Sequence, residues 1–433
     1  MLDVLEELGV RPARLFAGEH GFDGVAQAEV AVASLDAPRS ETRSDTGAGS
    51  DAAALSDQKP SSRRRQPGEG QLDLGLDEPA NTETDAELSW AADSGEDPSR
   101  ALDSAGPSLP PQIISLYGGD KTSLSPLPEH FAGIDVLLID LMDVGSRYYT
   151  FVWTALMAAR VAAKAGVHVL VLDRPNPISG DPTSVEGAPQ AAGYTSFVGL
   201  EPIPIRHAMT VGELLVHFFA RDGQALGPDG ALSVVSPRGW ERHRTAHAWT
   251  RPFIAPSPNM PTVETALVYP GGCLVEGTNL SEGRGTTLPF QTVGAPFLNG
   301  PALARSMADA RLPGVMVRPQ SFRPTFEKHA GELCHGVVLH VTDPRLFRPV
   351  TTYLTLISLA RQQAPSAFEF RTRPYEFETQ IPAFDLLTGS DVPRKALLAD
   401  VAANELVGLV APAGEEWQES LREIESLVAK AHA

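Results

Sequence analysis

Two short apolar runs joined by a helical segment constrain the fold of this chain more than any other feature. Residues 134–139 and 167–172 are nearly continuous apolar segments rich in β-branched side chains, and an alanine-rich stretch over 149–165 lies between them. Such runs are typical of strands buried on both faces of a parallel sheet, and the helix supplies the crossover. Pro175 and Pro177 prevent the second run from continuing. The sequence therefore predicts a βαβ unit and an α/β fold.

Other segments extend this pattern in both directions. Residues 2–8 look helical, and residues 13–17 look like a strand. Thr210 and Glu213 have the spacing of a capping box, which predicts a helix over 214–220. Beyond about residue 250 the pattern loosens into loops. The remaining predicted elements are strands over 315–317 and 336–341, a helix over 346–362, and a helix over 415–431 whose apolar stripe faces a core.

The segment over residues 33–112 differs in composition from the rest of the chain. It is dominated by Ser, Asp, Ala, Gly, Pro and Glu, it is acidic, and Trp90 is its sole aromatic residue. A segment of this kind buries too little apolar surface to offset the entropy lost on ordering. We therefore expect a disordered insertion, with the remaining residues long enough for two domains.

Charge and apolar patterning argue against several classes of protein. Lys and Arg number 35 against 54 Asp and Glu, and the resulting net charge of −19 would repel a nucleic acid. No run approaches the ~18 apolar residues that a membrane-spanning helix needs. Cys273 and Cys334 lack the paired spacing of a zinc site or a disulfide framework. Acidic residues near Met1 replace the basic region of a signal peptide, so we expect no export signal and a cytoplasmic location by default.

Polar residues follow the predicted strands where each strand ends. Ligands of open parallel sheets bind at the carboxyl ends of the strands, so these side chains are expected to converge on one cleft. Converging carboxylates suit acid/base or acid/nucleophile catalysis, although each residue could instead cap a helix or turn. The residues are Glu19 and His20 after the first strand, Asp140 and Asp143 after the second, and Asp173 and Asn176 after the third.

Several catalytic motifs are absent from the sequence. No Gly-x-Gly-x-x-Gly follows a predicted strand, and no Gly-x-Ser-x-Gly or His-Glu-x-x-His occurs. A nicotinamide enzyme and the serine and zinc hydrolases therefore lose support. Glu19, His20, Asp140 and Asp143 could bind a hard metal ion, but nothing fixes a ligand count, and we expect no metal and no cofactor.

Two loops are dense in hydrogen-bonding groups. Residues 256–261 form a proline-rich loop that presents Asn259, and residues 276–286 combine glycines with donors and acceptors, among them Glu276, Asn279, Glu282 and Arg284. Such loops suit a polar ligand such as a sugar, and the alternative is a solvated loop. His207, which precedes the predicted capping box, could equally be a turn histidine.

Six segments in this order resemble the DUF1343 family, which contains exo-β-N-acetylmuramidases of the NamZ type. The resemblance runs along the chain and skips the predicted insertion. The segments are 19–21 (EHG), 140–150 (DLMDVGSRYYT), 173–178 (DRPNPI), 206–210 (RHAMT), 257–261 (SPNMP) and 276–286 (EGTNLSEGRGT).

The resemblance implies a fold and a reaction. The fold is a Rossmann-like parallel-sheet domain over 1–245 followed by a smaller C-terminal α/β domain over 246–433, with the active site in the cleft between them. The reaction removes a terminal, non-reducing N-acetylmuramic acid from peptidoglycan-derived disaccharides or muropeptides. Glu19 is the implied catalytic residue, and we favour Asp143 over Asp140 as the second carboxylate.

The same resemblance implies substrate contacts. The lactyl carboxylate of muramic acid requires a cation, and Arg147 and Arg284 are the candidates because a guanidinium can grip a carboxylate with two hydrogen bonds. The hydroxyl and acetamido groups would be read by Asn176, His207, Asn259 and Asn279. The other predicted substrate-binding residues from the matching segments are His20, Tyr149, Glu276 and Glu282.

The sequence departs from the family in three places. It lacks the strand and loop that usually precede the first motif, and relatives are often exported, so the N-terminus looks truncated. The predicted insertion replaces a short connection, and Met142 stands where a glutamine is common. A non-catalytic module that binds muropeptides and a metal-dependent hydrolase in the same cleft are therefore the alternative functions.

Overall fold

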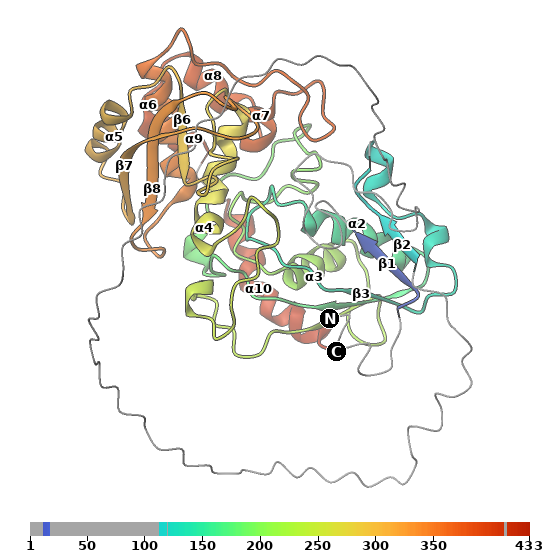
Figure 1. Ribbon diagram of the computed structural model, residues 1–433. Helices are drawn as coiled ribbons and strands as arrows, with labels where there is room; N and C mark the ends of the chain where they lie inside the picture. The colour runs from blue at the N-terminus through green and yellow to red at the C-terminus, as the bar shows by residue number, and fades with distance from the viewer. Residues whose placement is uncertain (1–11, 18–111, 119, 411–413) are drawn as a thin grey trace, which may run out of the picture. The chain divides into compact units, whose positions relative to one another are not determined.

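The computed structural model describes residues 12–17, 112–118, 120–410 and 414–433 (Figure 1). The helix predicted over 2–8, the catalytic candidate Glu19 and its neighbour His20 lie outside the described residues, as does nearly all of the segment 33–112. Within the described residues, no helix combines the length and the apolar character needed to cross a membrane.

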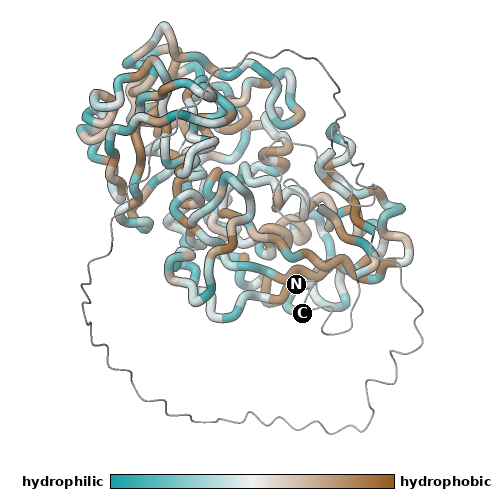
Figure 2. The backbone as a smooth tube through the Cα atoms, in the orientation of Figure 1, coloured by the Kyte–Doolittle hydropathy of each residue, from teal (hydrophilic) through white to brown (hydrophobic). Residues whose placement is uncertain are grey.

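The first sheet is parallel and contains the predicted βαβ unit. Its strand order is β3 (Val136–Ile139), β4 (His168–Leu172) and β5 (Leu232–Val235), with Val136 opposite His168 and Val169 opposite Leu232. Figure 2 shows long hydrophobic stretches along this part of the chain. A separate parallel pair consists of β1 (Arg14–Ala17) and β2 (Gln112–Ser115). The mixed α/β class and the parallel pairing predicted from the apolar runs are confirmed.

The described residues form two hydrophobic cores, and the first contains the β3-β4-β5 sheet. The crossover helix α2 (Phe151–Lys164) packs its apolar face into this first core. Val152, Trp153 and Leu156 are fully buried, and the Trp153 indole donates a 2.8 Å hydrogen bond to the Arg147 carbonyl. Gly166 follows the helix with φ of +76°, the left-handed conformation that commonly ends a helix. The alanines of α2 allow the helix to pack closely against the rest of the first core, because alanine favours a helix without adding bulk.

Helix α3 (Val211–Arg221) begins with the predicted capping box, which the structure confirms. The Thr210 hydroxyl accepts a hydrogen bond from the Glu213 amide, and the Glu213 carboxylate accepts one from the Thr210 amide. Asp173, at the end of β4, adds a third contact by accepting the Gly212 amide at 2.8 Å and the Thr210 hydroxyl at 2.6 Å. Asp173 thereby ties the end of the sheet to the start of α3.

Replacing Asp173 with asparagine should flatten the pH dependence of stability. The low-dielectric surroundings of Asp173 outweigh its hydrogen bonds from Thr210 and Gly212 and raise its pKa to about 7. In the unfolded state the pKa is ~3.9, so between this pH and about 7 the folded state binds more protons than the unfolded state. The stability that is present below this window is lost as the pH rises through it. The melting temperature of wild type should fall more between pH 5 and 8 than that of Asp173→Asn, as followed by circular dichroism. Equal slopes would contradict the assignment.

The second core contains an antiparallel sheet and most of the remaining helices. The sheet order is β6 (Thr292–Ala295), β8 (Cys334–Val341) and β7 (Val315–Phe322). Glu186, from the segment after β4, accepts the amides of Val350 and Thr351 and so caps α6 (Pro349–Gln363). The helices are α4 (Val263–Gly272), α5 (Gly300–Asp309), α6 (Pro349–Gln363), α7 (Ala383–Thr388), α8 (Val392–Leu398) and α9 (Ala403–Val410).

The prediction that the chain loosens into loops after residue 250 is wrong for α4, β6 and α5. All residues of helix α4 except Glu264 are buried, and the helix contains Pro270, so it shows no amphipathic periodicity. The strands predicted over 315–317 and 336–341 and the helix over 346–362 do form, as β7, β8 and α6.

The last helix, α10 (Glu415–Ala431), packs against the first core. Trp417, Leu421 and Ile424 are buried among the residues of α3 and β5, which confirms the predicted core-facing stripe. The Trp417 indole donates a 3.0 Å hydrogen bond to the His207 carbonyl. The C-terminal segment thus supports the turn that leads into α3.

Candidate active site

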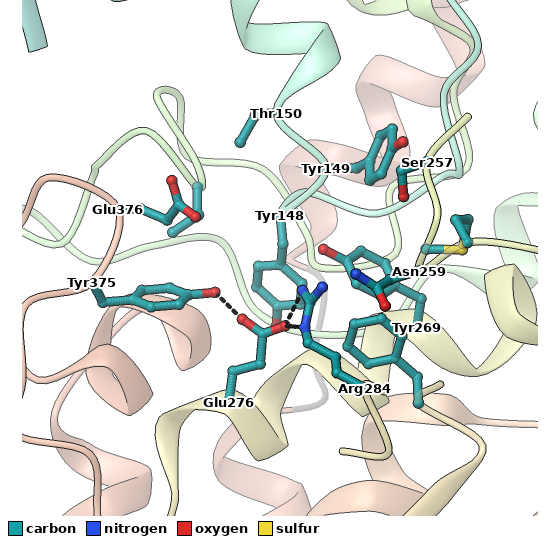
Figure 3. Close-up of a pocket in the computed structure, with 13 residues that line it drawn as sticks. Tyr148, Tyr149, Thr150, Ser257, Asn259, Tyr269, Glu276, Arg284, Tyr375 and Glu376 are labelled. Carbon is teal, nitrogen blue, oxygen red and sulfur yellow. Dashed lines mark hydrogen bonds and ion pairs between the residues drawn. The ribbon is translucent and has the colours of Figure 1, made fainter. Parts of the chain in front are cut away.

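A polar pocket lies where the segment before α2 meets residues from the second core (Figure 3). Its cavity volume is about 30 Å³. Aromatic rings and polar groups share the lining. The lining residues are Tyr148, Tyr149, Thr150, Val198, Ser257, Asn259, Met260, Tyr269, Glu276, Arg284, Phe290, Tyr375 and Glu376.

A buried carboxylate and guanidinium form the charged floor of the pocket. Arg284 contacts one oxygen of Glu276 through Nη2 at 2.7 Å and Nε at 3.3 Å, and the Tyr375 hydroxyl donates to the other oxygen at 2.7 Å. Figure 3 shows these side chains converging from two parts of the chain. Burial alone would raise the pKa of Glu276, but Arg284 and Tyr375 outweigh it and hold the pKa below its usual value. Glu276 is therefore ionised at neutral pH.

Two further charges lie beside this pair. Glu282 approaches the Arg284 Nε at 3.4 Å and Lys328 Nζ at 2.8 Å. Lys328 also donates to the carbonyls of Val275 and Thr278. Burial would lower the pKa of Arg284, but Glu276 and Glu282 raise it well above its usual value. Positive and negative groups thus alternate, and Arg284 is held from two sides in one orientation.

Glycines allow the loop over 276–286 to take this shape. Gly283 and Gly285 flank Arg284 with φ of +79° and +75°, a region that side chains with a Cβ rarely adopt. Gly277 follows Glu276, and a Cβ there would lie 2.6 Å from the Cα of Phe384. The Gly-Arg-Gly spacing in the sequence is therefore a backbone requirement for presenting Arg284.

The structure brings some of the predicted residues together in this pocket. Tyr149, Asn259, Glu276 and Arg284 line it, and Glu282 contacts Arg284 directly. Sequence reasoning missed several residues of the same site, and for three of them the segment carries no dense polar pattern and only tertiary packing brings the side chain here. They are Lys328, Tyr375 and Glu376.

The Arg147 side chain binds backbone carbonyls in this structure. Its guanidinium is fully buried and donates to the carbonyls of Ala188, Ile203 and Leu387 at 2.7–2.9 Å. Burial lowers its pKa to about 10, which still leaves it charged at neutral pH. Arg147 thus joins a loop after β4 to the end of α7, and it does not line the pocket.

Two predicted asparagines also bond backbone groups. The Asn176 side chain accepts from the Ile178 amide and donates to the Met209 carbonyl. The Asn279 side chain donates to the Ala367 carbonyl and accepts from the Glu369 amide. Each holds two segments together, and neither lines the pocket.

Asp143 and His207 lie close together near the end of β3. The Asp143 Oδ2 accepts the Gly145 amide at 2.7 Å and lies 3.6 Å from the His207 Nε2. Because the His207 Nδ1 accepts the Met209 amide, we assign the ring proton to Nε2, facing Asp143. Both residues are buried, and neither Asp143 Oδ1 nor His207 Nε2 has a hydrogen-bond partner among the described residues.

Asp140 has a different partner and faces a more open environment. Its carboxylate pairs with the Arg174 Nε at 2.6 Å, and the Arg174 side chain is 42% exposed. The two aspartates of the 140–150 segment therefore have separate surroundings. Their catalytic roles stay predictions, as do those of Glu19 and His20. Among the described residues, no three His, Cys, Asp or Glu side chains are grouped in a way that could hold a metal ion.

Comparisons with known proteins match nearly the whole described region. A family model for the N-terminal part of exo-β-N-acetylmuramidase NamZ matches residues 92–264, and one for its C-terminal part matches residues 267–425. The peptidoglycan β-N-acetylmuramidase NamZ of Bacillus subtilis (strain 168) is 45% identical over 258 residues. That match covers 60% of each protein, so this chain spans about three fifths of the length of its curated relative.

Two solved structures of DUF1343 family proteins from Bacteroides fragilis NCTC 9343 share the fold. One is 27% identical with a TM-score of 0.62 and covers 76% of this chain and 82% of its own. The other is 27% identical with a TM-score of 0.53 and covers 74% and 79%. With two family models matched in order over about three quarters of the sequence, the chain belongs to the NamZ family of exo-β-N-acetylmuramidases.

Proposed function

We propose that this chain is a glycoside hydrolase that releases N-acetylmuramic acid from the non-reducing end of peptidoglycan fragments. Family membership and the activity named for the Bacillus subtilis relative support the reaction class. The observation that carries the proposal for this chain is the fixed guanidinium of Arg284 in a pocket lined by polar and aromatic side chains.

Arg284 is the proposed anchor for the lactyl carboxylate of the sugar. Its side chain is 14% exposed, it is oriented by Glu276 and Glu282, and its guanidinium lies 5.0 Å from the centre of the Phe290 ring. A guanidinium held in one orientation loses little further freedom when it grips a carboxylate. Tyr149 and Asn259 line the same pocket and supply an aromatic face and an amide for the rest of the sugar.

Glycosidic cleavage also needs a protonated acid beside the leaving oxygen. Glu276 is unsuited to this step because Arg284 and Tyr375 keep it ionised. We therefore retain Glu19 as the proposed acid, on the basis of the family resemblance, with Asp143 as the proposed second carboxylate. The pairing of Asp143 with His207 supports this choice over Asp140, whose carboxylate is bound to Arg174.

The proposal includes the finer description of the fold. The parallel order of β3, β4 and β5, with α2 as the crossover, supports a Rossmann-like arrangement of the first sheet. The division into domains near residue 245 stays a prediction.

The decisive experiment is release of a chromogenic aglycone from its N-acetylmuramic acid β-glycoside. Wild type should turn over, and Glu19→Gln should be folded but slower by roughly 100-fold or more, because general acid catalysis contributes ~10²–10⁴-fold. Binding of the sugar without release by wild type would instead favour a non-catalytic module. Loss of turnover with EDTA, restored by added metal, would favour the metal-dependent alternative.

Tyr375→Phe should shift the acid limb of the pH–rate profile. Loss of the Tyr375 hydrogen bond removes one of the contacts that hold the pKa of Glu276 below its usual value. The acid limb of kcat/KM should therefore move to higher pH by up to about one unit, with little change above neutrality. An acid limb that stays in place would mean that ionisation of Glu276 is not required for turnover.

A further inference from the structure

The loop between β7 and β8 packs against the polar loop over 276–286. Thr325 donates to the Gly285 carbonyl through its amide at 3.1 Å and through its hydroxyl at 3.0 Å. The His329 Nε2 lies 2.7 Å from the Asn279 carbonyl oxygen. Gly285 permits the close approach, because a Cβ there would lie 2.7 Å from the Thr325 amide nitrogen. The β7–β8 loop is therefore fixed against the segment that presents the pocket guanidinium.

Lys328 extends from this loop toward the charged floor of the pocket. Its neighbours Glu327 and His329 have φ angles of +65° and +59°. Residues other than glycine rarely adopt this left-handed conformation, so the backbone is strained on both sides of Lys328. The Lys328 side chain is only 13% exposed, and its Nζ lies 2.8 Å from the Glu282 Oε2. Backbone strain beside a buried charge points to a use for the Lys328 ammonium group.

The Lys328 ammonium group lies among oxygen atoms of the polar loop. It donates to the Val275 carbonyl at 2.9 Å and to the Thr278 carbonyl at 3.1 Å, in addition to its ion pair with Glu282. Lys328 does not line the pocket, so it can affect a bound sugar only through another residue. Glu282 provides that link, because its Oε1 lies 3.4 Å from the Arg284 Nε.

The charges in the pocket floor balance only when Lys328 is included. The carboxylates of Glu276 and Glu282 contact the cations of Arg284 and Lys328, and the four formal charges cancel. Without Lys328, two carboxylates would face one guanidinium, and the floor would carry a net negative charge. The whole chain has a net charge of −19, so its overall field also opposes the binding of an anion.

We propose that Lys328 is a positioning residue for substrate selection, which neutralises Glu282 so that Arg284 retains its attraction for the lactyl carboxylate of N-acetylmuramic acid. This inference rests on the proposed function and deepens it by naming the charge that sets the preference for an anionic sugar. Removal of Lys328 would leave the charge of Glu282 acting on Arg284 alone, and the floor would then repel the carboxylate of the substrate.

The test compares Lys328→Met with wild type on two chromogenic β-glycosides. One is that of N-acetylmuramic acid, and the other is its analogue with the lactyl carboxylate converted to a neutral amide. On the acid, kcat/KM should fall about 10- to 100-fold, because an unbalanced charge in a buried site is weakly screened. On the amide it should change little. An equal fall on both substrates would show that Lys328 acts only through the fold and would overturn the proposal, as would an unchanged kcat/KM on the acid.

Two further variants separate the charge of Lys328 from its hydrogen bonds. Lys328→Met with Glu282→Gln restores the charge balance but not the hydrogen bonds to the Val275 and Thr278 carbonyls. Most of the kcat/KM on the acid should return in this double variant, and a failure to return would overturn the proposal. If Lys328→Met melts below wild type, Lys328→Gln decides, because it keeps N–H donors without the charge. A wild-type preference for the acid in Lys328→Gln would overturn the proposal.

The matched control is Lys395→Met, which makes the same change in net charge away from the pocket. Lys395 lies on α8, its side chain is 67% exposed, and it pairs with Asp391. The preference for the acid over the amide should be unchanged in this variant. A loss of preference equal to that of Lys328→Met would assign the effect to the overall charge of the protein and would overturn the proposal.

Calorimetric binding of free N-acetylmuramic acid separates this inference from the hydrolase proposal. A wild type that binds the sugar but does not hydrolyse the glycoside would refute hydrolysis, and weaker binding by Lys328→Met would still support the role of Lys328. Equal binding by wild type and Lys328→Met would refute that role. A wild type that neither binds nor hydrolyses would overturn both proposals.

Discussion

Arg284→Met is expected to reduce kcat/KM for N-acetylmuramic acid glycosides by roughly 100- to 1,000-fold, since losing one partner of a buried charge pair costs ~2–5 kcal/mol. Methionine retains the apolar stem but cannot hold the lactyl carboxylate. The change also removes the guanidinium that binds Glu276, which keeps the Tyr375 hydrogen bond and the more distant charge of Lys328. Initial rates over a range of substrate concentrations measure the effect. Wild-type kcat/KM in the folded variant would contradict the role given to Arg284.

The free energy of unfolding of the same variant should fall, and its pH dependence should change. Removing one member of a buried ion pair typically costs about 3–5 kcal/mol. In wild type the pKa of Glu276 lies below its usual value, so its contribution is present above the unfolded pKa and lost as pH falls through the folded pKa. Without Arg284, burial should raise that pKa, and the variant should lose stability as pH rises instead. Urea unfolding at pH 5 and 8 tests this, because the variant should lose more stability over this range than wild type, which already loses the contribution of Asp173.

A double variant separates binding from stability. Arg284→Met with Glu276→Gln removes both charges, while Glu282 keeps its contact with Lys328. Most of the lost stability should return, because replacing a buried ion pair by neutral groups is often near neutral. Activity should not return, because the cation is still missing. Recovery of both properties would show that Arg284 acts only through the fold.

Arg147→Met is expected to destabilise the protein by about 3–5 kcal/mol, because three buried carbonyls lose the guanidinium, one of them keeping the Tyr148 hydroxyl as a donor, and each unsatisfied group costs ~1–3 kcal/mol. These carbonyls belong to Ala188, Ile203 and Leu387. Arg147→Lys keeps the charge and one donor, so its loss should be intermediate. Chemical denaturation measures both variants. A Met variant of wild-type stability with a raised KM would instead support the substrate contact predicted for Arg147 from the sequence.

The parts of the fold that sequence could predict have strong local signals. The strands β3 and β4 are short apolar runs, and α2 is a regular alanine-rich helix ended by Gly166. Helix α4 lacks such a signal, because nearly all of its residues are buried and it ends in Pro270-Gly271-Gly272. The structure explains these small residues by close packing, since a Cβ on Gly271 would lie 2.1 Å from the Pro349 oxygen. Contacts of this kind depend on the tertiary structure.

The candidate site was predictable to a similar degree. Dense polar loops identified Asn259, Glu276 and Arg284, all of which line the pocket. Sequence treated Arg147 and Arg284 as equal candidates, and only their partners in the folded chain separate them, carbonyls for Arg147 and carboxylates for Arg284. Tyr375 and Glu376 gave no signal, because Tyr375 reaches Glu276 across 99 residues of sequence.

The central claim is that Arg284 selects the sugar by its anionic lactyl group. It is tested most directly by the ratio of kcat/KM for two chromogenic β-glycosides, one of N-acetylmuramic acid and one of N-acetylglucosamine, which lacks that group. We expect wild type to prefer the muramic acid substrate strongly. In Arg284→Met, and in the double variant with Glu276→Gln, the preference should fall at least about 100-fold through the muramic acid substrate alone. A preference that survives in both variants would contradict the claim.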